Sequence, residues 1–296
     1  MPITLIPIGR PPRVQPPAVS LTIDGRAVSV PEGTTILSAC AAIGVAIPTL
    51  CFLETLKPVN VCRLCVVEVE GARVLVPSCS RAVEAGMIVQ TRSPRVMRAR
   101  RLVLELLASS VDLSTTPGMA GLLEEYECRP ERFGPDAATV AQPVKIDNDL
   151  YVRDYGKCVL CYKCVEACGT DHQNTFAIAV AGRGFDAHIS TEFAVALPDS
   201  ACVYCGNCIA VCPTGALMSR REHELRQTGE WDPPRQTTTD TICPYCGVGC
   251  TLTLHVQDGE IVKATSPLDN PITAGNLCIK GRFGWRFVEH SEPENR

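Results

Sequence analysis

Eight cysteines between Cys158 and Cys212 restrict the possible folds of this chain more than any other feature. They form two runs, CVLCYKCVEAC (158–168) and CVYCGNCIAVC (202–212), which share the spacing C-x2-C-x2-C-x3-C. We call them the first comb and the second comb. A cubane iron–sulfur cluster needs four thiolates that converge on its corners, and three cysteines spaced by two residues can wrap one loop around three corners. The spacing therefore predicts two 4Fe–4S sites.

The fourth cysteine of each comb is expected to bind the other cluster, as in bacterial two-cluster ferredoxins. The predicted first-comb set is Cys158, Cys161, Cys164 and Cys212, and the predicted second-comb set is Cys168, Cys202, Cys205 and Cys208. Pro213 follows the second comb as this ferredoxin pattern requires, whereas Gly169 follows the first. A zinc ribbon is the weaker alternative because it uses two C-x2-C pairs, and a disulfide scaffold would need a secretory context.

Composition supports a metal-stabilised chain with several small modules. The 296 residues contain 18 cysteines and carry a net charge of −4, which gives no reason to invoke nucleic acid or a membrane surface. Metal ligation adds folding free energy that small cores lack, so we expect three or four modules. Residues 1–17 form a proline-rich arm without the features of a signal peptide. No segment approaches the roughly 20 apolar residues of a membrane helix, so we expect a cytoplasmic protein.

Residues 18–93 have the pattern of a β-grasp ferredoxin domain. VSLTIDGRAVSV (19–30) predicts a hairpin that turns at Asp24-Gly25, followed by a helix capped by Thr34 or Thr35. Strands are expected at 66–71 and 73–78. The cysteines that complete the pattern, called the N-terminal set, are Cys51, Cys62, Cys65 and Cys79. Their spacing, C-x10-C-x2-C-x13-C, resembles the 2Fe–2S domain of the large iron–sulfur subunits of respiratory complex I, NAD-reducing hydrogenases and NAD-linked formate dehydrogenases. A structural zinc site is the alternative.

Residues 94–145 are interpreted as a helix and a linker. PRVMRARRLVLELLAS (94–109) predicts an amphipathic helix with a proline at its first position. A short helix is expected near 118–127. In the related subunits such a helix leads into a cluster bound by one histidine and three cysteines. Between Ser80 and Lys157 this chain has one cysteine, Cys128, and no histidine. We therefore expect that cluster to be absent.

The two combs define a ferredoxin-type domain at 146–222, with a hairpin between them that turns at 182–184. Residues 223–239 are polar and are predicted to be a linker. The domain at 240–296 contains the third set, which is Cys243, Cys246, Cys250 and Cys278. TLTLHVQDGEIVKAT predicts a hairpin that turns at Asp258-Gly259. The motif C-x2-C-x3-C-x27-C-x-K-G resembles the 4Fe–4S domain of molybdenum/tungsten bis-pterin oxidoreductases, which implies that Lys280 is an electron relay. A solvated surface lysine is the alternative.

Taken together, the chain resembles the N-terminal iron–sulfur region of the alpha subunit of a cytosolic NAD-dependent molybdenum/tungsten formate dehydrogenase. YVRDYGKCVLCYKCVEACGTDH, CVYCGNCIAVCPTGALM and TICPYCGVGC carry this resemblance. It implies an α+β multi-module fold, one 2Fe–2S cluster and three 4Fe–4S clusters. It also implies a flavin/NAD-binding iron–sulfur partner subunit, and a catalytic domain with a Mo/W bis-pterin (bis-MGD) cofactor in the complete enzyme. We expect this chain to be a truncated or naturally short part of that oxidoreductase, inactive by itself and without catalytic residues of its own.

Three alternatives and several residues stay open at this stage. The chain could instead be a diaphorase-type subunit of an NAD-reducing hydrogenase or a stand-alone multi-cluster electron carrier. A zinc-stabilised interaction protein is a further alternative. Cys40 and Cys128 lie outside the four sets, and Cys40 fits a buried position on a helix. Structural or solvent-facing roles are expected for His172 and His188, because four cysteines already fill each cluster.

Overall fold

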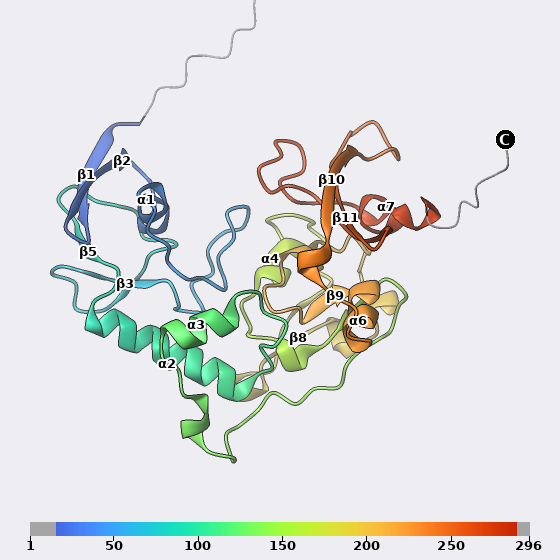
Figure 1. The fold of residues 1–296 in the computed structure, drawn as a ribbon, viewed down its shortest axis with the longest axis horizontal. Helices are drawn as coiled ribbons and strands as arrows, with labels where there is room; N and C mark the ends of the chain where they lie inside the picture. The colour runs from blue at the N-terminus through green and yellow to red at the C-terminus, as the bar shows by residue number, and fades with distance from the viewer. Residues whose placement is uncertain (1–15, 289–296) are drawn as a thin grey trace, which may run out of the picture. The chain divides into compact units, whose positions relative to one another are not determined.

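The structure, a computed structural model, describes residues 16–288 (Figure 1). Residues 1–15 of the predicted proline-rich arm lie outside this range. Within the described range the chain divides into two compact units, one made of residues 16–47 and 65–96 and the other of residues 48–64 and 97–288. Both units combine helices with strands, as the predicted α+β class requires. Within the described range, no helix has the length and apolar character needed to span a membrane.

The first unit is built on a five-stranded sheet with the strand order β2-β1-β5-β3-β4. Its strands are β1 (Ala18–Ile23), β2 (Arg26–Pro31), β3 (Val66–Val69), β4 (Val76–Pro77) and β5 (Ile88–Gln90). β5 runs parallel to β1, and the other pairs are antiparallel. Helix α1 (Ile36–Ala42) contributes the fully buried Ile36 to the core, which also contains Ile23 and Val89. A mixed sheet with one helix is the arrangement predicted for residues 18–93.

Local sequence signals account for most of this unit. Asp24 and Gly25 have φ values of 47° and 78°, so the predicted two-residue turn is confirmed. Thr35 caps α1, because its hydroxyl accepts a hydrogen bond from the Ser38 amide at 3.2 Å. The expected strands at 66–71 and 73–78 are shorter in the structure. Gly71, at φ 80°, turns the chain immediately after β3.

The segment interpreted as helix and linker contains two packed helices. α2 (Pro94–Ser110) and α3 (Met119–Glu125) agree with the two predicted helices. From Met97 onward α2 belongs to the second unit, where Leu104, Met119 and Tyr126 share a buried cluster. Arg100 Nη1 donates to the Tyr126 hydroxyl at 3.0 Å. A 3-10 turn (Pro130–Phe133) follows. Much of the predicted linker is therefore ordered by its own core.

The two combs belong to a small module closed by a pair of strands. β6 (Tyr151–Arg153) precedes the first comb and pairs antiparallel with β9 (Leu217–Ser219), which follows the second. Each comb ends in a short helix, α4 (Lys163–Cys168) or α5 (Asn207–Val211). Between the combs, β7 (Ala179–Ala181) and β8 (His188–Ser190) form the predicted hairpin. Short 3-10 turns occupy Tyr155–Lys157, Gly184–Asp186, Glu192–Ala194 and Leu197–Asp199.

The third set lies beside a three-stranded antiparallel sheet. Its strands are β10 (Thr237–Ile242), β11 (Thr251–Gln257) and β12 (Glu260–Thr265). The predicted turn between β11 and β12 is confirmed, because Asp258 and Gly259 have φ values of 55° and 89°. Helix α7 (Ile279–Phe283) begins directly after Cys278 and continues as a 3-10 turn (Gly284–Val288).

The prediction of a linker across residues 223–239 was wrong at both of its ends. Helix α6 (Arg220–Gln227) extends into the segment, and β10 begins at Thr237. A 3-10 turn (Pro233–Arg235) lies between them. The Ser219 hydroxyl caps α6 by accepting from the Glu222 amide at 3.1 Å, and Glu222 pairs with Arg226 one turn later. Leu225 is the only apolar residue that α6 buries. The polar composition of the segment therefore gave no hydrophobic pattern from which a helix could be predicted. The domain limits themselves stay predictions.

Candidate iron–sulfur sites

The two combs repeat one backbone conformation. The second and fourth residues after the leading cysteine are left-handed in both, with φ values of 50° at Leu160, 65° at Tyr162, 56° at Tyr204 and 70° at Gly206. A left-handed L-residue costs about 1–2 kcal/mol. Three non-glycine residues bear this cost, and such strained loops persist where functional geometry is fixed by their surroundings. The conformation curls each comb around its own cysteine sulfurs.

This curl directs backbone N–H groups at the sulfurs. The Leu160 amide donates to Cys158 Sγ, and the Tyr204 amide donates to Cys202 Sγ, each at 3.4 Å. Donors at equivalent positions favour the anionic form of sulfur, and hydrogen bonds to sulfur are one of the main controls on cluster potential. The combs therefore share both their ligand spacing and their first layer of hydrogen bonds.

The fourth cysteine of each comb lies near the opposite comb. Burial raises the pKa of Cys158 to about 12 and that of Cys161 to about 11, and the charge of Cys212 contributes to both shifts. Burial also raises the pKa of Cys205, with a contribution from Cys168. The four cysteines of the second-comb set line one apolar cavity together with Tyr151 and Leu197. These positions support the crossed ligand sets, although the assignment of ligands to clusters stays a prediction.

The donor set fits an iron–sulfur cluster. Buried neighbouring thiols hold one another's pKa values high, so four thiolates at such a site require a compensating metal charge. Burial raises the pKa values of Cys164 and Cys208 well above the usual range, with further contributions from neighbouring cysteines. Across residues 16–288, no three His, Cys, Asp or Glu side chains are grouped as ligands of a single metal ion.

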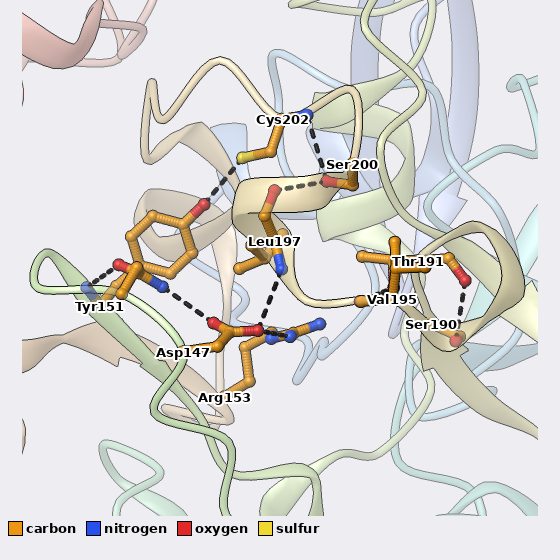
Figure 2. Close-up of polar contacts among 10 residues, drawn as sticks. Asp147, Tyr151, Arg153, Ser190, Thr191, Val195, Leu197, Ser200 and Cys202 are labelled. Atoms are coloured by element: carbon orange, nitrogen blue, oxygen red, sulfur yellow. Dashed lines mark hydrogen bonds and ion pairs between the residues drawn. The ribbon is translucent and has the colours of Figure 1, made fainter.

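Tyr151 provides a side-chain hydrogen bond to the second-comb set (Figure 2). Its hydroxyl lies 2.9 Å from Cys202 Sγ, and the residue is only 1% exposed. Burial raises the pKa of Tyr151, and the charges of Cys208 and Cys202 raise it further. The phenol therefore stays protonated, and it would be the donor of this hydrogen bond when Cys202 binds a cluster as a thiolate.

A chain of polar contacts fixes Cys202 and β6 relative to each other (Figure 2). Asp147 pairs with the buried Arg153 and accepts from the Leu197 amide at 3.0 Å. The Ser200 hydroxyl donates to the Leu197 carbonyl at 2.8 Å and accepts from the Cys202 amide at 3.2 Å. Because Asp147 binds the guanidinium, the buried charge of Arg153 is compensated.

The N-terminal set is divided between the two units. Cys51 and Cys62 belong to the second unit, where their shared hydrogen bond raises the pKa of Cys51 and lowers that of Cys62 to about 5. Cys65 and Cys79 belong to the first unit, with their sulfurs 3.5 Å apart. Each half thus brings two of the predicted ligands together within its own unit.

The third set combines one buried cysteine with two exposed ones. Cys243 is 7% exposed and its amide donates to the Cys250 carbonyl at 2.8 Å, whereas Cys246 and Cys278 are exposed. Burial raises the pKa of Cys250, and the charges of the other three cysteines add to this. Lys280, the predicted relay, is exposed at the start of α7.

Sequence reasoning missed the residues that join the third set to the second comb. Asn207, between Cys205 and Cys208, accepts from the Leu277 amide at 3.0 Å and from Arg282 at 3.2 Å. Phe283 stacks on Tyr151 with ring centroids 6.2 Å apart. Asn207 lies within a comb and Arg282 within the K-G-R continuation of the third motif, but neither position indicated its partner.

The remaining cysteines and histidines have settings of their own. All 18 cysteines lie in the described range, and none forms a disulfide. Cys40 is fully buried in the α1 face, as expected. Cys128 is half-buried, and burial raises the pKa of its thiol. His172 bonds to the Thr55 carbonyl and His188 to the Asp186 carbonyl, at 3.0 Å and 2.7 Å.

Three protein families match successive parts of the chain. Residues 17–94 match the 2Fe-2S iron-sulfur cluster binding domain, residues 157–216 the 4Fe-4S dicluster domain, and residues 236–290 the molybdopterin oxidoreductase Fe4S4 domain. The predicted fold class is thereby confirmed. The number of clusters bound stays a prediction.

Similar proteins are subunits of oxidoreductases. The NADPH-Fe(3+) oxidoreductase subunit alpha of Geobacter sulfurreducens is 36% identical over 91% of this chain and 31% of its own length. An NADH-quinone oxidoreductase subunit of Rhizobium meliloti is 33% identical over 92% and 32%, respectively. A putative formate dehydrogenase of Staphylococcus haemolyticus is 24% identical over 92% and 31%. The chain thus spans about a third of the length of these relatives.

A solved structure resembles part of this chain. A chain of an NAD+-reducing [NiFe]-hydrogenase in the H2-reduced state has a TM-score of 0.60 and 25% identity, covering 68% of this chain and 87% of that one. On this chain the three iron–sulfur domain types follow one another in the order 2Fe-2S, 4Fe-4S dicluster and molybdopterin Fe4S4. The chain is therefore an iron–sulfur region of oxidoreductase type, similar over more than nine tenths of its length to these NADPH-Fe(3+) and NADH-quinone oxidoreductase subunits.

Proposed function

We propose that this chain is the iron–sulfur electron-transfer part of an NAD-dependent molybdenum/tungsten formate dehydrogenase. In this role it connects a bis-pterin site, where formate is oxidised or carbon dioxide reduced, with a flavin/NAD partner subunit. Iron–sulfur clusters supply one-electron transfer when bound. The chain's own residues hold these clusters, bury them and adjust their charge environment.

The observation that carries the proposal is that the third set is both attached to the second comb and exposed. The Leu277 amide beside Cys278 donates to Asn207 Oδ1 of the second comb. Cys246, Cys278 and Lys280 are nevertheless exposed. This cluster-binding module is attached to a ferredoxin module and exposes two ligands and a lysine. Such a surface is suited to contact a further redox domain. The molybdopterin oxidoreductase Fe4S4 match supports a pterin domain as that neighbour.

The first-comb set is influenced by a cysteine of the N-terminal set. The charge of Cys62 contributes to the raised pKa of Cys161, after burial and the other neighbouring groups. Cys62 belongs to the predicted 2Fe–2S ligands, so the sets follow one another from the third set through the second and first combs toward Cys62. This order supports electron exit toward the NAD-binding partner at the N-terminal end.

The relatives indicate what else the complete enzyme would need. The chain spans about a third of their length, and we propose that the catalytic pterin domain is supplied by further sequence or by another subunit. Formate as the substrate is supported by the putative formate dehydrogenase among the relatives and by the third motif.

The test is reduction of the chain's clusters within its complete complex under anaerobic conditions. Formate should reduce the iron–sulfur EPR signals, and NAD+ should reoxidise them. The isolated chain should contain about fourteen irons, from one 2Fe–2S and three 4Fe–4S clusters, and should not oxidise formate with an artificial acceptor. Zinc without labile sulfide, or formate oxidation by the isolated chain, would refute the proposal.

A second candidate is an electron-transfer subunit of an NAD-reducing hydrogenase. The structural match to a hydrogenase chain favours it, whereas the motif around Lys280 favours a pterin partner. The same complex distinguishes the two candidates. Reduction of its clusters by hydrogen but not by formate would establish the hydrogenase assignment.

A further inference from the structure

Arg282 is a buried cation beside the second comb. It lies on α7 and is 5% exposed. Its Nη1 donates to the Ala264 carbonyl at 3.3 Å and its Nη2 to Asn207 Oδ1 at 3.2 Å, and both acceptors are neutral. Across residues 16–288, no carboxylate forms an ion pair with Arg282, and its Nε–H has no hydrogen-bond partner. A buried charge in this state is costly unless an anion compensates it.

The anionic groups that act on the Arg282 guanidinium are cysteine sulfurs. Burial lowers the pKa of Arg282 to about 10, while the charges of Cys205 and Cys208 raise it. The guanidinium therefore stays protonated at neutral pH. Arg153, which is also buried near the second comb, differs from Arg282 because its charge is paired with Asp147. Of these two arginines, Arg282 is therefore the one whose positive charge is not compensated by a carboxylate among the described residues.

Asn207 fixes the position of this charge. It is 3% exposed and lies between Cys205 and Cys208. Its Oδ1 accepts from both Arg282 and the Leu277 amide. The aliphatic part of Arg282 lies against Gly206, where an added Cβ would be 3.0 Å from Arg282 Cγ. The guanidinium is therefore held by neutral partners that leave its charge available to the sulfurs.

We propose that Arg282, positioned by Asn207, raises the reduction potential of the cluster bound by the second-comb set. Reduction adds one electron, supplied by the preceding donor, to a group already made anionic by four thiolates. A fixed cation stabilises the reduced form more than the oxidised form, and the buried setting strengthens this interaction. The neutral Asn207 is essential to the effect, because a carboxylate at that position would cancel the charge.

The competing explanation is that Arg282 only holds α7 against the second comb. A purely structural role predicts looser packing without a change of potential in a cluster that remains bound. The two roles separate when charge and hydrogen bonding are changed independently. Arg282→Gln removes the charge and keeps hydrogen-bonding capacity, whereas Arg282→Lys keeps the charge and loses the paired donors.

The experiment is an EPR-monitored redox titration of the full chain, prepared anaerobically with its clusters. Each cluster gives one redox transition, here called its wave. The wave of the cluster bound by the second-comb set is identified as the one that Cys202→Ser alters. At the potential where that cluster is half reduced in the unmodified chain, Arg282→Gln should lower the ratio of reduced to oxidised cluster at least tenfold. For a one-electron couple this equals a shift of at least 59 mV to more negative potential. Arg282→Lys should give a smaller shift.

The controls make the outcome decisive. Arg221→Gln removes a cation from α6 that pairs with Glu260, and it should leave the wave in place. The other three clusters serve as internal references. An unmoved wave in Arg282→Gln, or equal shifts in Arg282→Gln and Arg282→Lys, would overturn the proposal.

If Arg282→Gln does not retain the cluster of the second-comb set, the Asn207→Asp variant tests the proposal instead. It should also shift the wave to more negative potential, and an unchanged or more positive potential would overturn the proposal.

Discussion

Gly206 is the position where the second comb depends most directly on its neighbour. The equivalent residue of the first comb, Tyr162, has nearly the same backbone, with φ 65° against 70°. The tyrosine shows that this conformation accepts a side chain. At Gly206, however, an added Cβ would lie 3.0 Å from both Arg282 Cγ and Phe283 Cζ. We therefore attribute the glycine to the packing of α7 and predict that Gly206→Ala weakens that packing.

Two effects set the size of the change. An alanine in the left-handed region costs about 1–2 kcal/mol. Overpacking at a close contact costs about a further 1–3 kcal/mol, because Arg282 and Phe283 must move. Gly229→Ala is the matched control, since Gly229 has φ 75° and no atom within 4 Å of an added Cβ. The control bears the backbone cost alone, so the packing cost is the difference between the two variants.

Hydrogen exchange of the α7 amides is the appropriate measurement, because a multi-domain cluster protein has no single free energy of unfolding. The Arg282 amide, which donates to the Cys278 carbonyl at 3.0 Å, reports opening of α7. A loss of about 1–3 kcal/mol would lower its protection about 5-fold to more than 100-fold. Gly229→Ala should leave it unchanged. Equal protection of α7 in Gly206→Ala and the unmodified chain would refute the docking of α7 on the second comb.

Three further variants test other contacts. Tyr151→Phe removes the hydroxyl beside Cys202 Sγ and should shift the potential of the second-comb cluster to more negative values in a redox titration; an unchanged potential would exclude this hydrogen bond as a control. Cys212→Ser should damage the cluster of the first comb, so EPR loss confined to the second comb's cluster would contradict the crossed ligand sets. Lys280→Ala, in the complete enzyme, should slow NAD reduction without changing pterin content, and an unchanged rate would make Lys280 an ordinary surface lysine.

Local signals in the sequence predicted the local structure well. The Asp24-Gly25 and Asp258-Gly259 turns form because two adjacent residues can adopt positive φ values, which is a property of the dipeptide itself. The Thr35 cap and the helix from Pro94 likewise depend on a few neighbouring residues. The comb spacing indicated the ligand type because cluster geometry restricts cysteine spacing directly. Each of these features is encoded within a short stretch of chain.

The contacts that distinguish the sites could not be predicted in this way. Asn207 and Arg282 are 75 positions apart in the sequence, and Tyr151 and Cys202 are 51 apart. No periodicity relates such residues, and their pairing depends on how β12, α7 and the second comb pack. Helix α6 was missed for a related reason. Only Leu225 indicates its buried side, so the hydrophobic pattern was too weak to oppose the polar composition.

The packing of α7 also explains a difference between two combs that look equivalent in sequence. Lys163 and Asn207 occupy the same position, directly before the third cysteine of each comb, and both are buried. In the first comb the charge of Lys163 itself opposes the raised pKa of Cys161. In the second comb the neutral Asn207 holds Arg282, whose charge acts on Cys205 and Cys208. Each of the two comb sets therefore has a buried cation beside it, the first-comb set from Lys163 within its own comb and the second-comb set from Arg282 on α7. Arg282 belongs to α7, which directly follows Cys278 of the third set. The charge environment of the second-comb set therefore depends on the correct packing of α7 against the second comb.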